Sequence, residues 1–294
     1  MDEQIRTLES MRKRVLHADI AVFAIAVGGF IFSIFTLHLF LMFPAIILAI
    51  LAYFLLVRKK SKEYKEYYKN VFVRGMIRQV IPDAEYEPGK GFPRELIRET
   101  GLMLMGNIYS SEDYIRGSYN NVSFERADIL IQDEATDSDG NTTTTTYLRG
   151  RWMIFESNKN FEADLQLIQK GFGYANKRRG LFTKKADRRH EFKTEDEAFN
   201  KTFQCLCQNE SEAFYLLTPG VMQGLLRLAS QTDGKIMVGF VDNRLHVAVN
   251  SKKDSLEPPV FRSFNNGDFD EVRNEINAIT GFVESVNLDR KIFK

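Results

Sequence analysis

The sequence contains little that points to catalysis or metal binding. It has two cysteines, Cys205 and Cys207, which are too close together for a disulfide to close a useful loop, so we expect buried, reduced thiols. No G-x-S-x-G, H-E-x-x-H, Walker A or G-x-G-x-x-G motif occurs. The sequence therefore predicts no cofactor, no metal and no catalytic residues, and it favours a protein that is not an enzyme.

A strong charge of either sign is also lacking. Lys and Arg number 40 against 39 Asp and Glu, which gives a net charge of +1 over 294 residues. This balance provides no overall field that would attract a polyanion. We therefore expect no nucleic-acid partner.

Two segments match metal sites in part. Asp137, Asp139 and Gly140 resemble a calcium loop, but Ala135 and Thr146 then stand where the first and last oxygen ligands belong. We interpret the segment as the polar tip of a hairpin. The cysteine pair could join His190 or His246 at a zinc ion, but structural zinc sites favour wider ligand spacing. We expect instead that His246 lies in a sheet with its ring facing a polar neighbour.

Residues 20–57 contain no Asp, Glu, Lys, Arg, Asn or Gln. One helix of this length would run about 57 Å, nearly twice the hydrocarbon core of a bilayer, so two spans at about 20–37 and 39–57 fit better. The run is too long for the core of a cleaved signal peptide. A re-entrant hairpin that does not cross is an alternative, and Pro44 is compatible with it.

Basic residues flank both ends of this apolar segment, while the turn around His38 has none. They are Arg6, Arg12, Lys13, Arg14, Arg58, Lys59, Lys60, Lys62 and Lys65. The positive-inside rule places both termini in the cytoplasm. Ala24 and Gly28 form a small-xxx-small pair, which we expect to pack inside the hairpin rather than to drive oligomerisation. The oligomeric state is left open.

The remaining sequence predicts an α+β domain with a largely antiparallel sheet. The second span continues as an amphipathic stalk until Pro82, which gives two domains, 1–82 and 83–294, with a linker at 83–93. We expect a long hairpin over 121–156 and strands at 203–207, 213–217, 235–241 and 245–249. Helices are expected after a capping box of Thr194 and Glu197, after Thr218-Pro219 and over 269–286.

The most distinctive local feature is a basic segment at residues 177–193. The predicted membrane-surface contacts are Lys177, Arg178, Arg179, Leu181, Phe182, Lys184, Lys185, Arg188 and Arg189. Near anionic headgroups each basic residue contributes about 1 kcal/mol, and the tether makes this contact intramolecular. A solvated loop is the alternative, because Asp187 and Glu191 dilute the charge.

Several short segments together resemble a known family. They are Val122-Ser-Phe-Glu-Arg-Ala-Asp128, Arg149-Gly-Arg-Trp-Met-Ile-Phe-Glu156, Thr194-Glu-Asp-Glu-Ala-Phe-Asn-Lys201, Glu212-Ala-Phe-Tyr-Leu-Leu-Thr-Pro219 and Leu245-His-Val-Ala-Val249. With the two-helix hairpin before them, they are similar to the bacterial membrane-protein family called domain of unknown function 3137. The resemblance implies a bacterial cell-membrane location. Members of that family also occur near LemA-type membrane proteins, which implies a shared assembly.

These features predict a membrane-tethered cytoplasmic interaction or scaffold module whose partners are the bilayer and a membrane protein. The alternative is an enzyme that acts on lipid or cell-envelope intermediates at the cytoplasmic face. A deep pocket with convergent polar groups and perturbed carboxylates or histidines would favour the enzyme.

Overall fold

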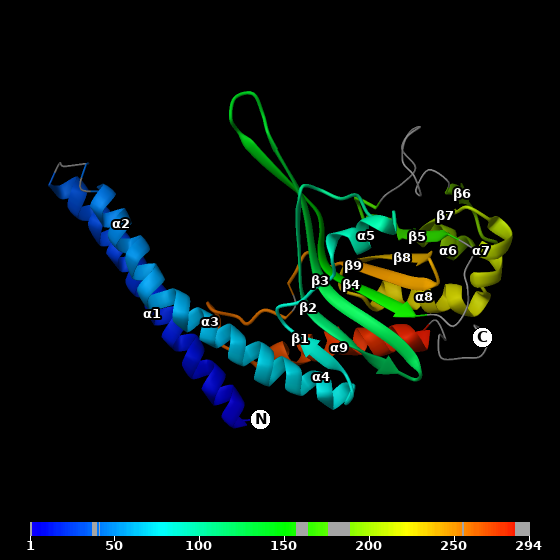
Figure 1. Ribbon diagram of the computed structural model, residues 1–294, viewed down its shortest axis with the longest axis horizontal. Helices are drawn as coiled ribbons and strands as arrows, with labels where there is room; N and C mark the ends of the chain where they lie inside the picture. Colours follow the sequence, from blue (N-terminus) through cyan, green and yellow to red (C-terminus); the bar gives the residue numbers. More distant parts are fainter. Residues whose placement is uncertain are drawn as a thin grey trace. The chain divides into compact units, whose positions relative to one another are not determined.

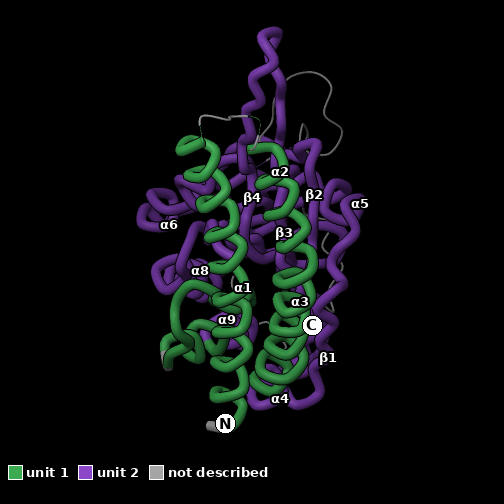
Figure 2. The backbone as a smooth tube through the Cα atoms, turned by 90° about the vertical axis from the view of Figure 1, so that its left-hand side faces the viewer, with its two compact units in different colours: residues 1–76, 256–273 green, residues 77–255, 274–294 purple. Residues whose placement is uncertain are grey.

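The computed structural model describes residues 2–36, 40, 42–156, 164–175, 189–254 and 256–285 (Figure 1). The chain forms two compact units, coloured in Figure 2. Unit 1 comprises Met1–Met76 and Leu256–Arg273, and unit 2 comprises Ile77–Ser255 and Asn274–Lys294. The first boundary lies six residues before the predicted one at 82, and a C-terminal segment that we assigned to the soluble domain groups with the helices.

Unit 1 is built on two long antiparallel helical runs. They are α1 (Asp2–Phe35) and a run made of α2 (Met42–Ala52), η2 (Tyr53–Val57), α3 (Arg58–Tyr67), η3 (Tyr68–Val73) and α4 (Arg74–Val80). The second run stays helical as far as Val80, close to Pro82, where the sequence predicted its end. Both runs are long and apolar enough to cross a membrane. Their apolar stretches leave large side chains exposed, among them Phe35 at 87% and Leu55 at 77%.

The two runs approach each other closely at Gly29. A Cβ atom added there would lie 2.3 Å from the Ala45 Cβ, so only glycine allows this spacing. Gly28 has nothing within 4 Å of the corresponding position, and Ala24 is exposed. The predicted packing of Ala24 and Gly28 inside the hairpin is therefore wrong, because the contact face of α1 is rotated by one residue.

The C-terminal part of unit 1 packs on the stalk through an aromatic cluster. Phe264 and Phe269 contact Phe72 edge to face, with ring centroids 5.1 and 4.8 Å away, and Tyr68 lies 6.1 Å from Phe264. The Tyr64 hydroxyl donates a hydrogen bond of 2.7 Å to the Pro259 carbonyl. The segment is thus anchored by both aromatic packing and a partly buried hydrogen bond.

Ionic contacts hold the same segment. Glu257 binds Lys65 and, at 2.8 Å, Lys69. Burial raises the pKa of Glu257, but hydrogen bonds from the two lysines lower it by more, so the carboxylate stays ionised. Arg12 of α1 donates a hydrogen bond of 2.9 Å to the Val260 carbonyl.

Unit 2 contains a nine-stranded antiparallel sheet in the order β1-β2-β3-β4-β9-β8-β5-β7-β6. Its strands are β1 (Glu85–Glu87), β2 (Ile108–Tyr119), β3 (Val122–Thr136), β4 (Thr142–Glu156), β5 (Leu165–Gln169), β6 (His190–Phe192), β7 (Phe203–Cys207), β8 (Lys235–Val241) and β9 (Arg244–Asn250). Its helices are α5 (Arg94–Glu99), α6 (Glu197–Thr202), α7 (Glu210–Leu216) and α8 (Pro219–Gln231), together with the second part of α9 (Asn266–Ser285). The predicted α+β class is confirmed.

Alternation in the strands directs side chains to two buried faces of the sheet. On one face Ala127, Ile129 and Trp152 belong to an apolar core that also contains Ile97 and Leu102. On the other face Phe155 stacks on Phe282 of α9, with ring centroids 4.8 Å apart. Because both faces are covered, polar residues that alternate with apolar ones, such as Arg126 and Asp128, are also buried.

The predicted hairpin over 121–156 is confirmed as β3 and β4, which pair from Phe124↔Phe155 to Thr136↔Thr142. At its tip, the Asp137 carboxylate accepts hydrogen bonds from the backbone of Asp139 and Asn141, as in a side-chain-supported turn.

Two local predictions are wrong. Residues 213–217, expected as a strand, belong mostly to α7, whose N-cap Asn209 accepts a hydrogen bond from the Ser211 backbone. Ala213 and Leu216 are buried at helical spacing. At α6 the N-cap is Asp196 and not Thr194, since the Asp196 carboxylate accepts from the Phe199 backbone.

Candidate functional site

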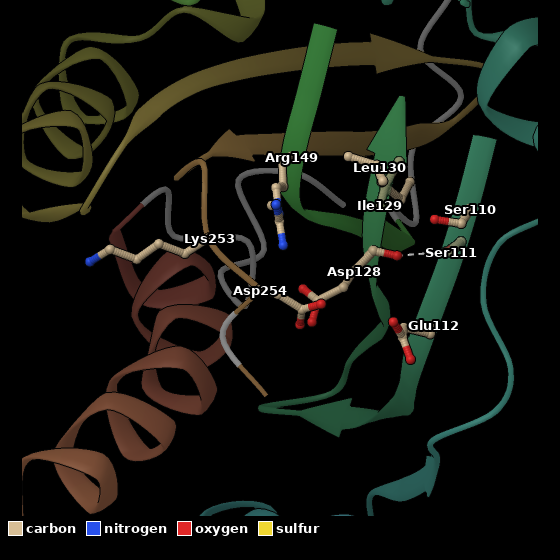
Figure 3. A pocket seen from close by; sticks show the side chains of 10 residues that line it. Ser110, Ser111, Glu112, Asp128, Ile129, Leu130, Arg149, Lys253 and Asp254 are labelled. Carbon is tan, nitrogen blue, oxygen red and sulfur yellow. Dashed lines mark hydrogen bonds between the residues drawn. The ribbon is translucent and has the colours of Figure 1, made fainter. Parts of the chain in front are cut away.

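Three carboxylates meet inside unit 2. Asp113 of β2, Asp128 of β3 and Asp254, which follows β9, each place an oxygen within 4.8 Å of the others. Asp113 is fully buried and Asp128 is 6% exposed, while Asp254 is half-buried. Figure 3 shows the side chains of Asp128 and Asp254 pointing toward one another. We call these three residues the aspartate cluster.

A bulge in β2 turns Asp113 inward. The register of β2 against β3 shifts between Glu112 and Ile115, and Asp113 has a φ of 58°, in the left-handed region. Its backbone N–H donates 3.1 Å to the Pro88 carbonyl, and its carboxylate accepts from the Tyr86 hydroxyl. These bonds fix a conformation that is costly for a residue with a Cβ atom.

Arg126 connects the cluster to α9. It lies two residues before Asp128 on β3, so the two side chains share a face, and it donates 2.8 Å to Asp128 Oδ1. Arg126 also approaches Glu275 of α9 at 3.5 Å, and Glu275 in turn binds Arg151 of β4. The charged network is almost entirely removed from water, since Arg126 is 1% exposed.

Burial controls the charge of Asp128. Its pKa is raised to about 8: desolvation raises it most, the nearby carboxylates of Asp113, Asp254 and Glu275 also raise it, and Arg126 lowers it. The Asp128 Oδ2 atom is buried and has no hydrogen-bond partner among the described residues. A buried carboxylate oxygen without a partner is unusual in a folded protein.

A small cavity of about 90 Å³ is lined in part by Asp128 and Asp254. Its lining residues are Ser110, Ser111, Glu112, Asp128, Ile129, Leu130, Arg149, Gly150, Lys253 and Asp254. A Cβ atom at Gly150 would lie 2.1 Å from the Val249 carbonyl oxygen, so the strands come this close only with glycine there. Typical ligand pockets measure about 300–1,000 Å³, whereas a water molecule occupies about 30 Å³. The cavity is therefore the size of an ion or a few waters.

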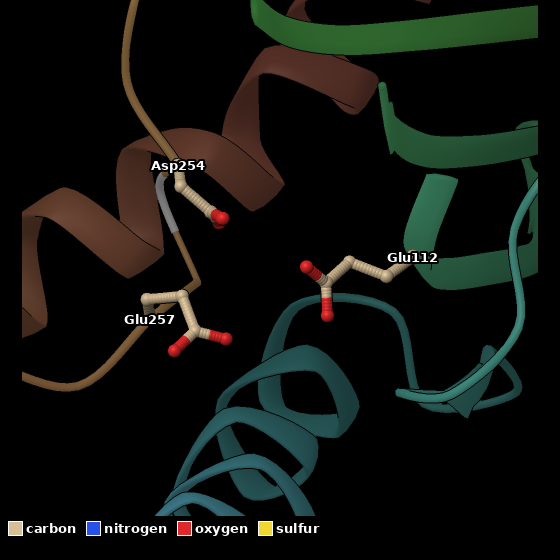
Figure 4. A group of neighbouring side chains, drawn as sticks. All are labelled: Glu112, Asp254 and Glu257. Carbon is tan, nitrogen blue, oxygen red and sulfur yellow. The ribbon is translucent and has the colours of Figure 1, made fainter. Parts of the chain in front are cut away.

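Glu112 extends the acidic character of this region. Its carboxylate and that of Asp254 also come within 4.8 Å of each other, and Figure 4 shows them pointing toward one another. Figure 4 also labels Glu257, which belongs to unit 1, where Lys65 and Lys69 bind it. Within unit 2, Glu112 is exposed and lines the cavity.

A larger hollow of about 650 Å³ lies beside β6, β7 and α6. Lys170, Lys193 and Lys201 line it, with Phe203 and Cys205 among its apolar residues. Burial raises the pKa of Cys205 to about 12, so the thiol stays protonated and is a poor nucleophile. Cys207 is also buried and free, as predicted for structural cysteines.

The predicted membrane-contact residues fall almost entirely outside the described part of the chain. These are Lys177, Arg178, Arg179, Leu181, Phe182, Lys184, Lys185 and Arg188. Arg189 is described and is 1% exposed. It forms an ion pair of 2.6 Å with Asp164 and donates to the Thr100 carbonyl. Arg189 therefore does not contribute to a surface, because its guanidinium is used inside unit 2.

His246 lies in β9, and its polar neighbour is the indole of Trp152. The Trp152 Nε1 donates 3.2 Å to His246 Nδ1, so this nitrogen carries no proton. The pKa of His246 is lowered to about 4, mainly by burial and also by the charge of Arg244, while Asp242 opposes the shift. The predicted sheet position and polar contact are confirmed.

The aspartate cluster was missed at the level of sequence. Its one local signal is the run Arg126-Ala-Asp128, in which two charged residues occupy alternate positions just before the apolar run 129–131. Alternation of this kind usually indicates a face in water. This face is buried because α9 packs on it, and α9 lies far away in the sequence.

Comparison with known proteins supports the family resemblance. Residues 146–288 match the model of a family described as "Protein of unknown function (DUF3137)". The resemblance is confirmed over this range, which includes Asp254 but not Asp113, Asp128 or the two apolar helical runs. No curated protein matches the chain.

One similar solved structure is the crystal structure of the mycobacterial trehalose monomycolate transport factor A, TtfA. It is 10% identical, with a TM-score of 0.35, and the match covers 78% of this chain and 97% of that one.

Proposed function

We propose that this protein is a membrane-anchored module in which unit 1 holds unit 2 at the cytoplasmic face of a bacterial cell membrane. The observation that carries the proposal is the exposed apolar surface of the two helical runs. Side chains such as Phe35 and Leu55 are left uncovered along both spans. Exposure of this extent is stable in hydrocarbon and costly in water.

The orientation rests on charge. Arg12 to Arg14 precede the first span, and Arg58 to Lys60 follow the second. Basic residues at both ends keep both termini on the cytoplasmic side.

Topology reporters test the anchor and its orientation together. A C-terminal fluorescent protein that folds only in the cytoplasm should fluoresce, while alkaline phosphatase at the same position should be inactive. The protein should stay in the membrane pellet after alkaline carbonate extraction. Active alkaline phosphatase would reverse the orientation, and release by carbonate would refute the anchor.

Binding is the activity that unit 2 supports best. The cavity beside its perturbed carboxylate measures about 90 Å³, which excludes a lipid or sugar substrate from that point. The enzyme alternative keeps one supporting observation, the raised pKa of Asp128, which is typical of groups that transfer protons. An Asp128→Asn variant that folds and retains its cellular role would remove this support.

The basic segment and a LemA-type protein are the proposed contacts of the module. In lipid nanodiscs, Lys177, Lys184 and Lys185 should be protected from acetylation by anionic lipid and less by neutral lipid. Lys201, whose side chain is 78% exposed in α6, is the control and should react equally in both. Equal labelling of all four lysines would refute lipid contact. Purification from the native membrane should enrich a LemA-type protein over an unrelated two-helix anchor, and equal recovery would refute that partner.

A further inference from the structure

The aspartate cluster offers oxygen ligands of the kind that hard cations bind. Asp113, Asp128 and Asp254 come from three separate parts of the chain, and their oxygens lie within 4.8 Å of one another. Calcium–oxygen bonds measure about 2.3–2.6 Å, so ligands on opposite sides of one ion stand about 4.6–5.2 Å apart. The spacing of the cluster therefore fits coordination of a single ion.

Asp128 provides an independent indication of a ligand. The residue is 6% exposed, its Oδ1 is held by Arg126, and its Oδ2 is buried without a hydrogen-bond partner among the described residues. Figure 3 shows this carboxylate directed toward Asp254. Leaving such an oxygen unsatisfied is costly, and a bound cation would satisfy it.

The surrounding contacts hold the ligands in place before any ion binds. Tyr86 donates to Asp113, and Arg126 donates to Asp128. Ser111 Oγ donates 2.8 Å to the Asp128 carbonyl and accepts from the Phe92 backbone, which fixes β2 against β3 at the site. Partners of this kind orient ligands and strengthen metal binding.

The cavity, which Asp128 and Asp254 line and Asp113 does not, limits the size of the ligand. Its volume of about 90 Å³ accommodates an ion with two or three waters. Carboxylate and water oxygens favour Mg²⁺, Ca²⁺ or Mn²⁺ over softer metals. We infer that unit 2 binds one divalent cation of this class at Asp113, Asp128 and Asp254.

Bound metal would join the β2–β3 hairpin to a segment that is distant from it in sequence. Asp113 and Asp128 lie on adjacent strands, whereas Asp254 lies on the segment that leaves the sheet after β9. Occupancy would therefore fasten the end of that segment to the sheet and stabilise the folded protein by linkage.

The test uses the full chain in detergent, with Mn²⁺ binding followed by electron paramagnetic resonance and Mg²⁺ and Ca²⁺ added as competitors. We expect one Mn²⁺ per chain. Asp128→Asn and Asp254→Asn should each weaken binding by about tenfold or more. Glu197→Gln, which removes a carboxylate that is 89% exposed in α6, should leave it unchanged.

Two results would overturn the inference. One is the absence of stoichiometric binding of all three cations at millimolar concentration. The other is binding that both aspartate variants retain, which would place the ion elsewhere. If either variant fails to fold, Tb³⁺ luminescence of the unaltered chain decides, because Tyr86 beside Asp113 should sensitise an ion in the cluster. Tb³⁺ luminescence without tyrosine sensitisation would refute the site.

Discussion

The two units differ in where they place exposed apolar side chains and buried charges. In unit 1 large apolar side chains face outward, as Phe35 does at 87% exposure, and the inward contacts include a glycine against an alanine. In unit 2 the guanidinium of Arg126 is buried at 1% exposure among carboxylates. Each arrangement is stable only in surroundings that offset its cost in free energy. Exposed apolar side chains are costly in water, as in unit 1, and buried charges are costly without a partner, as in unit 2.

The difference predicts that unit 2 is most sensitive to loss of a buried charge. Arg126→Met should destabilise unit 2 by about 3–5 kcal/mol, because Asp128 and Glu275 would lose a buried partner. Urea unfolding of the full chain in detergent measures this, since Trp152 is the single tryptophan and lies in the core of unit 2.

Arg116→Met is the matched control. Arg116 forms an ion pair with Glu85 in the same unit, but both side chains are more than half exposed. We expect little change in the urea midpoint. If the two variants behaved alike, burial would not be what makes the charges of unit 2 important.

A second prediction concerns acid stability of unit 2. The pKa of His246 is about 4 in the folded protein and 6.5 in the unfolded chain, so below pH 6.5 the unfolded state binds the proton first. The resulting loss of stability should grow as the pH falls and reach about 3 kcal/mol near pH 4. Urea unfolding across this range measures it.

His246→Asn keeps an acceptor near Trp152 and cannot titrate. Compared with the unaltered chain, this variant should lose less stability between pH 6.5 and pH 4, while the two should respond to pH equally above 7. Parallel curves over the whole range would show that His246 is not held neutral by burial.

The smallest expected effect lies in unit 1 and tests its packing. Gly29→Val should destabilise the helical pair by about 1–3 kcal/mol, because the new side chain would collide with Ala45. Gly28→Val, one residue away, meets nothing within 4 Å and should be nearly neutral. Thermal unfolding in detergent, followed by circular dichroism, compares the two.

If Gly28→Val destabilised the helical pair more than Gly29→Val, Gly28 would be the packing position, as the sequence predicted. Loss of an oligomer in Gly28→Val alone would show that the outward small residues mediate self-association, the alternative that the sequence left open.

The sequence predicted features that depend on local patterns. The hairpin of β3 and β4, the strands β7 to β9 and the capped start of α8 follow from alternation, turn residues and a Thr-Pro pair. The Thr218 hydroxyl indeed accepts a hydrogen bond from the Val221 backbone. The apolar segment was equally clear, because no tertiary contact is needed to recognise it.

Features that depend on distant contacts were not predictable. Residues 213–217 are rich in aromatic and aliphatic side chains and resemble a strand, yet Asn209 caps a helix there. The aspartate cluster requires a bulge at Asp113, pairing of β2 with β3 and the return of the chain at Asp254. None of these leaves a short motif, since each ligand has a different neighbourhood in the sequence.

The aromatic cluster of unit 1 also determines how this protein can be divided. The chain leaves unit 2 after β9, contributes Phe264 and Phe269 to unit 1, and re-enters unit 2 within α9. A fragment that begins at residue 77 would carry these two phenylalanines without Tyr68 and Phe72. Their exposed rings would favour aggregation of a domain that is otherwise folded. A fragment made for solution work should therefore begin no later than Tyr64, so that Phe264 and Phe269 keep Tyr68 and Phe72 as aromatic partners.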